Sequence, residues 1–104
     1  MVMESSVLRF AETVRALGLE ARRHRLKMPG FRSPPRLHGV DRSVRRRPDG
    51  GATIAVVVRG RPWAAVVADM VEGVVVANGL TGKDADRVRS KLWHVVGGDQ
   101  IVAA

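Results

Sequence analysis

The sequence predicts an α+β protein in which three helices pack on a small antiparallel sheet. Apolar residues recur at helical spacing in three segments, and two strand-like runs flank a turn signature between the first and second of these segments. The expected order is helix, extended segment, two strands of a β-hairpin, helix, helix. With 104 residues, 45% of them apolar, the chain suits a single domain, residues 1–104, around one aliphatic core.

The first helix is expected over residues 4–17. Phe10, Val14 and Leu17 repeat every three or four positions and form part of one apolar stripe. Gly18 follows the stripe directly, at the position where a glycine in the left-handed conformation commonly ends a helix. The sequence therefore predicts that the helix stops there.

Residues 19–39 are expected to form an extended basic segment. Pro29, Pro34 and Pro35 exclude a regular helix over this stretch. Apolar side chains recur among its arginines, which a disordered tail would lack, and they should hold the segment on the core. These expected anchors are Leu26, Met28, Phe31 and Leu37.

A β-hairpin is expected over residues 40–59. Pro48-Asp49-Gly50 fits a type I turn that ends in a glycine with the left-handed conformation. The second strand, from Ala52 onward, is apolar on both sides and should therefore be covered on both. The first strand, up to Arg47, is charged, which suits the edge of a sheet.

Two further helices are expected over residues 62–78 and 82–96. Pro62 suits the first turn of the earlier helix, and Gly97 suits the end of the later one. The helix over 62–78 is apolar around most of its circumference, and Gly73 in its middle indicates the close approach of another element. We interpret this surface as a homodimer contact, the alternative being that the chain's own elements cover it.

Positive charge is concentrated between Ala21 and Gly51. This stretch holds ten basic and two acidic residues, which accounts for the whole net charge of +8. A field this localised attracts polyanionic partners. With two arginines just beyond it, the candidate binding residues are Arg22, Arg23, Arg25, Lys27, Arg32, Arg36, Arg42, Arg45, Arg46, Arg47, Arg59 and Arg61.

The basic stretch predicts a small nucleic-acid-binding protein, with DNA favoured over RNA. Arginines that neutralise phosphates release condensed counterions, and this contribution does not depend on base sequence. The outer faces of the last two helices are nearly neutral, so base reading by a helix is not indicated and weak sequence preference is expected. The alternative is a non-enzymatic adaptor that docks an acidic protein partner through the same arginines.

The tetrapeptide Arg59-Gly60-Arg61-Pro62 resembles the core of an AT-hook, in which both arginines enter the minor groove of AT-rich DNA. AT-hooks lie in flexible basic flanks, whereas apolar residues flank this tetrapeptide on both sides. A tight strand-to-helix turn with glycine at the bend is therefore the favoured interpretation. The two arginines would then extend the basic surface beside a helix N-terminus.

No catalytic or metal-binding pattern is indicated, so no enzyme activity, cofactor or metal is expected. The chain contains no cysteine. Asp69 and Glu72 share a helix face, as solvated carboxylates commonly do, and His24, His38 and His94 do not show metal-ligand spacing. The sequence shows neither a secretory signal nor a membrane span, and a cytoplasmic location without a membrane partner is expected.

Overall fold

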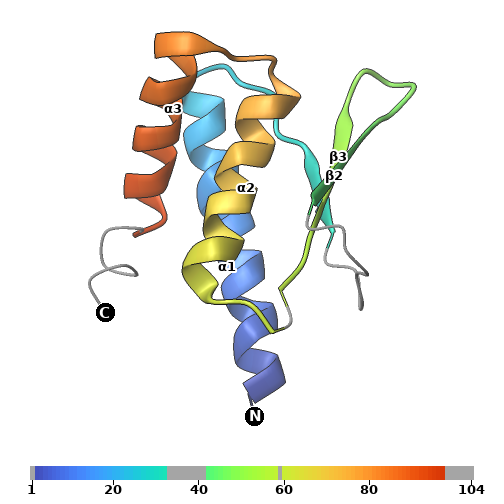
Figure 1. The fold of residues 1–104 in the computed structure, drawn as a ribbon, viewed down its shortest axis with the longest axis vertical. Coiled ribbons are helices and arrows are strands. Elements are labelled where there is room, and N and C mark those ends of the chain that lie inside the picture. Colours follow the sequence, from blue (N-terminus) through green and yellow to red (C-terminus); the bar gives the residue numbers. More distant parts are fainter. Residues whose placement is uncertain (1, 33–41, 59, 98–104) are drawn as a thin grey trace.

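The computed structural model describes residues 2–32, 42–58 and 60–97, and for residues 2–8, 42–44 and 46 it describes the backbone alone. Three helices lie beside a three-stranded sheet (Figure 1). The helices are α1 (Val2–Arg23), α2 (Trp63–Ala77) and α3 (Gly82–Val95). The strands are β1 (Gly30–Arg32), β2 (Arg42–Arg46) and β3 (Ala52–Val56). The α+β class is thus confirmed.

The sheet is mixed, which corrects the expected antiparallel topology. β3 is the central strand, with β1 parallel to it on one side and β2 antiparallel to it on the other. The sequence predicts only an extended segment where β1 lies. Three residues give no alternation to detect, and the partners of β1, from Thr53 to Ala55, lie far along the chain.

β2 and β3 are joined by the turn expected at Pro48-Asp49-Gly50. The carbonyl oxygen of Arg47 accepts a hydrogen bond from the N–H of Gly50 at 3.1 Å, and Gly50 has a φ of 86°. The N–H of Arg47 donates to the carbonyl oxygen of Gly51 at 2.8 Å and closes the loop. Both strands are shorter than the range 40–59 implies, and residues 40, 41 and 59 lie outside the described part of the chain.

α2 packs on the sheet and on both other helices, and Figure 1 shows it between α3 and the sheet, with α1 behind it. A Cβ at Gly73 would lie 3.0 Å from Phe31 Cε1 and 3.2 Å from a methyl carbon of Ile54. The close approach expected at Gly73 is confirmed, and the sheet is what approaches. Because elements of the same chain cover both sides of α2, its apolar surface gives no support to a homodimer through residues 62–78.

α1 continues through Gly18 as far as Arg23, so the predicted stop at Gly18 is wrong. Leu17 and Ala21, one helical turn apart, are both fully buried and prolong the apolar stripe. Glycine within a helix costs roughly 1 kcal/mol relative to alanine, and burial of such side chains outweighs that cost.

α1 ends in a Schellman motif. The N–H of Leu26 donates to the carbonyl oxygen of Ala21 at 2.8 Å, and the N–H of Arg25 donates to that of Arg22 at 3.1 Å. Arg25 takes a φ of 56°, the left-handed conformation that glycine usually provides at this position. The expected extended segment 19–39 therefore begins after this motif.

The boundaries of α2 and α3 agree with the prediction to within one residue, whereas α1 begins two residues before the expected start. Gly60, with a φ of 77°, forms the bend before α2, Pro62 precedes the first residue of that helix, and Gly97 follows α3 with a φ of 73°. No helix in the described ranges is long and apolar enough to cross a membrane. Of the expected anchors, Leu26, Met28 and Phe31 pack against the core, and Leu37 lies outside the described residues.

Candidate functional site

The face of the sheet that turns away from α2 carries exposed arginines. Phe31 and Ile54 lie opposite each other in β1 and β3 and both meet α2 at Gly73, so their neighbours along each strand face the other way. Arg32 follows Phe31 in β1, and Arg45 of β2 lies opposite the residue before Ile54. Both arginines are exposed.

Arg47 adds a third guanidinium at the start of the turn. A Cβ at Gly51 would collide with this guanidinium, and a Cβ at Gly30 would lie 3.7 Å from its Nη1. The side chain thus lies across the backbone of two glycines from different parts of the chain. Asp49 Oδ1 accepts the N–H of Gly51 at 2.9 Å and lies 3.4 Å from Arg47 Nε, so the acid in the turn helps to position Arg47.

Arg32, Arg45 and Arg47 together form what we call the basic sheet face. β1 and β2 are the two edges of the sheet with β3 between them, so Arg32 and Arg45 stand roughly 10 Å apart across the strands. All the helices of the described part lie on the other side of the sheet (Figure 1). Asp49 is the one carboxylate, among the described residues, that pairs with any of these three arginines.

The basic residues in the last turn of α1 and in the connection after it form a separate group. Arg22, Arg23, Arg25 and Lys27 are all exposed. Arg23 Nη1 lies 3.6 Å from a Glu20 oxygen, yet its side chain remains 79% exposed. α1 packs mainly on α2 and α3 rather than on the strands, so the structure divides the predicted basic surface into two groups.

Arg61, which the sequence predicts as part of the basic surface, has its side chain engaged within the protein. Its Nη1 donates to Asp69 Oδ2 at 2.6 Å and to the carbonyl oxygen of Val57 at 3.3 Å, and its side chain is 23% exposed. Arg61 thereby stabilises the bend at Gly60. The expected turn before α2 is confirmed for the described residues of this tetrapeptide.

Four candidate residues have side chains outside what the structure describes. Arg36 and Arg59 lie in undescribed positions of the chain. Arg42 and Arg46 are described by their backbone, which pairs with β3 in the antiparallel ladder.

The two acids of α2 are each held by an arginine. Glu72 accepts two hydrogen bonds from Arg89 of α3, from Nε at 2.7 Å and from Nη2 at 3.0 Å. This two-pronged bond joins α3 to α2 and, more than any other contact, raises the pKa of Arg89 above its usual value. Asp69 binds Arg61 as described above. Both carboxylates therefore act as structural ion-pair partners.

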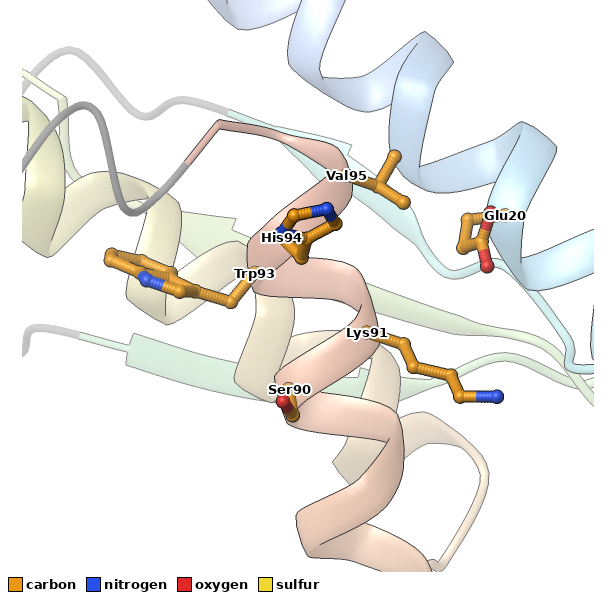
Figure 2. Close-up of a pocket in the computed structure, with 6 residues that line it drawn as sticks. All are labelled: Glu20, Ser90, Lys91, Trp93, His94 and Val95. Atoms are coloured by element: carbon orange, nitrogen blue, oxygen red, sulfur yellow. The ribbon is translucent and has the colours of Figure 1, made fainter.

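The hollow between α1 and α3 does not gather converging groups. Figure 2 shows Glu20 on α1 across from Lys91 and Val95 on α3, whereas Trp93 projects from another side of α3. A ring nitrogen of His24 donates to the Glu20 carboxylate at 2.8 Å, and this bond is the main cause that lowers the pKa of Glu20 below 4.5. Within the described ranges, no cluster of histidine, aspartate and glutamate is arranged to hold a metal ion.

Comparisons of the chain with protein-family models, with curated proteins and with solved structures find no match. The site must therefore be interpreted from its own residues. Sequence reasoning missed two features of the site. Gly30 and Gly51 lie beneath the Arg47 side chain, and Asp49 positions it. The spacing of Arg47 and Asp49 within a turn signature is the signal that could have indicated their contact.

Proposed function

We propose that this protein is a non-enzymatic nucleic-acid-binding protein that grips phosphates with its basic sheet face, with DNA as the preferred ligand. The observation that supports this most directly is the position of Arg32, Arg45 and Arg47 on one face of the sheet, away from every described helix. Guanidinium groups suit phosphate because their planar fork can donate two parallel hydrogen bonds.

The geometry of this face favours backbone contacts over recognition of bases. Arginines at both edges, about 10 Å apart, can reach different phosphates of one strand or of two. The aromatic residue of β1, Phe31, packs against α2, so the described part of the face offers no platform on which unpaired bases could stack. These features favour duplex DNA and weak sequence preference.

Salt titration with a fluorescent random-sequence DNA duplex tests the proposal. Three phosphate contacts predict a slope of about −2.7 when the logarithm of the binding constant is plotted against that of the salt concentration. Arg32→Ala and Arg45→Ala should each make the slope shallower by about 0.9. Arg87→Ala removes one exposed positive charge from α3 and should leave the slope unchanged. A slope of about −5.4 would correspond to six phosphate contacts and would indicate that two copies bind together, as expected for a homodimer.

A lysine variant separates this function from the docking of an acidic protein at the same face. Lysine at positions 32, 45 and 47 loses the fork but keeps the charge, and charge dominates binding to a DNA backbone more than it dominates a bidentate contact with a carboxylate. We expect the triple Arg→Lys variant to retain most of its affinity for duplex DNA. DNA binding that hardly changes between about 50 and 200 mM salt, or that falls equally in Arg87→Ala, would contradict the proposal.

A further inference from the structure

A second hollow lies on the outward side of α1, where the helix passes into the Schellman motif. Its rim is cationic and consists of Arg15, Arg22 and Arg25. Arg15 and Arg22 stand two helical turns apart on one side of α1, about 10 Å along its axis. Arg25 reaches the same hollow because its left-handed backbone turns the chain back toward the helix.

Among the described residues, the lining of this hollow includes no acid. Within the same part of the chain, none of the three arginines has an ion-pair partner. Two arginines of α3, Arg87 and Arg89, are by contrast held by acids. Three guanidinium groups around one depression therefore present unneutralised positive charge.

The floor of the hollow is apolar and accessible. Leu19 is 61% exposed, more than any other large apolar residue described, and Leu26 and Met28 are half-buried beside it. Gly18 also lines the hollow, and the space over it is open, because a Cβ built there would meet nothing within 4 Å. An exposed leucine next to an open depression is typical of a surface that another molecule covers.

The combination of charge and apolar floor selects the kind of partner. A nucleic-acid backbone would neutralise the arginines but would bring no apolar group to Leu19. A second copy of this chain, facing the same hollow, would set the three arginines against each other. A segment that carries both carboxylates and an apolar side chain can pair with the arginines and also cover Leu19.

We propose that this hollow is a docking site for an acidic amphipathic segment of a partner protein. An apolar side chain of that segment enters the depression at Gly18 and covers Leu19, and its carboxylates pair with the arginines of the rim. Because this site is lined by α1 and the connection after it and includes no residue of the basic sheet face, it does not depend on the nucleic-acid function of that face.

The probe for this site is a fluorescein-labelled helical peptide of about 16 residues with glutamate and leucine on one face. We expect it to bind the unmodified protein. Replacing its glutamates by glutamine, or its leucines by alanine, should each weaken binding by roughly tenfold, because the partner needs both features. On the protein, Arg22→Glu should weaken binding by a similar factor by reversing one charge of the rim.

Gly18 provides a steric test that leaves the charge unchanged. Gly18→Gln fills the depression with a good helix former and should weaken peptide binding by roughly tenfold. Gly18→Ala is the matched control and should bind as the unmodified protein does, since one methyl group leaves the depression open. Circular dichroism checks that both variants keep the fold.

Three results would overturn the proposal: unchanged binding in Gly18→Gln, equal binding of the alanine-substituted peptide, or the absence of any peptide binding. Displacement of the peptide by random duplex DNA, with DNA binding weakened in Gly18→Gln, would instead assign the hollow to nucleic acid. Arg45→Ala separates the two proposals, because it should weaken DNA binding and leave peptide binding intact.

Discussion

The side-chain amide of Asn78 hydrogen-bonds both backbone groups of Lys27. Its Oδ1 accepts the N–H of Lys27 at 2.7 Å, and its Nδ2 donates to the carbonyl oxygens of Lys27 and Val74, each at 2.8 Å. Asn78 immediately follows α2, and Lys27 lies in the connection between α1 and β1. One side chain therefore joins the end of α2 to the connection that leads into the parallel strand.

Asn78→Ala should lower the free energy of unfolding by about 1–2 kcal/mol, because it removes all three hydrogen bonds, of which the one to Val74 is partly buried. Urea denaturation followed by circular dichroism measures this change. Asn78→Asp keeps an acceptor for the Lys27 N–H but loses both donated bonds, and it adds negative charge where α2 ends. We expect it to be at least as destabilising as alanine. An alanine variant as stable as the parent would show that the connection is held by other contacts.

Two glycines within helices should respond to alanine in opposite ways. Gly18 has open space around it, so Gly18→Ala should raise the free energy of unfolding by about 1 kcal/mol through helix propensity. Gly73→Ala places a methyl group against Phe31 and Ile54 and should lower it by about 1–3 kcal/mol.

Denaturant titration of this glycine pair is informative because both positions lie in helices and receive the same methyl group. The difference between the two changes in unfolding free energy therefore reports the packing of α2 on the sheet, with helix propensity cancelled. If Gly73→Ala were as stabilising as Gly18→Ala, the close approach of β3 to α2 would be refuted.

The elements that the sequence predicted well are those whose signals are local. α2 and α3 carry long apolar stripes bounded by Pro62 and Gly97, and the hairpin turn contains Gly50 at its left-handed position. The predicted stop at Gly18 failed because a glycine that ends a helix and one inside it look alike until burial of Ala21 is known. β1 depended on a distant partner, which no local pattern reveals.

For the candidate site, the sequence predicted which residues take part but not how they are arranged in space. The arginines of the basic sheet face were all among the candidates, because charge can be counted from the sequence. Their separation from the arginines of α1 depends on the layer formed by α2, which the sequence does not specify. Likewise, the side chain of Arg61 is unavailable to the basic surface because it forms an ion pair with Asp69 of α2, and the sequence does not reveal this pair. Arg15 was overlooked because a helix ending at Gly18 cannot align it with Arg22.

The contact between Glu20 and His24 predicts acid sensitivity. The pKa of Glu20 is lowered, chiefly by the hydrogen bond from His24, so the folded state favours the charged carboxylate. The resulting stabilisation is complete above the ordinary pKa of 4.5 and is lost as the pH falls through the lower pKa of the folded state. The stability difference between the parent and Glu20→Gln should therefore shrink below pH 4.5, as urea titrations at several pH values can show. A difference that stays constant into stronger acid would contradict this assignment.

Asp49 restrains the basic sheet face, so its removal should strengthen DNA binding. Asp49→Asn abolishes the ion pair with Arg47 but keeps an oxygen that can accept the N–H of Gly51, and the turn is preserved. An exposed pair of this kind is worth about 0.2–1 kcal/mol, so the affinity for random duplex DNA should rise by no more than about fivefold. Fluorescence anisotropy at about 100 mM salt measures the change.

The matched control for that variant is Asp84→Asn on α3. It raises the net charge by the same amount and frees Arg87 from an exposed ion pair of 2.8 Å, but it lies away from the sheet. If DNA binds the basic sheet face, Asp84→Asn should change the affinity much less than Asp49→Asn does, because screening confines the effect of an exposed charge to about 10 Å. An equal gain in both variants would mean that DNA responds to net charge alone, and the assignment of the contact to Arg32, Arg45 and Arg47 would fail.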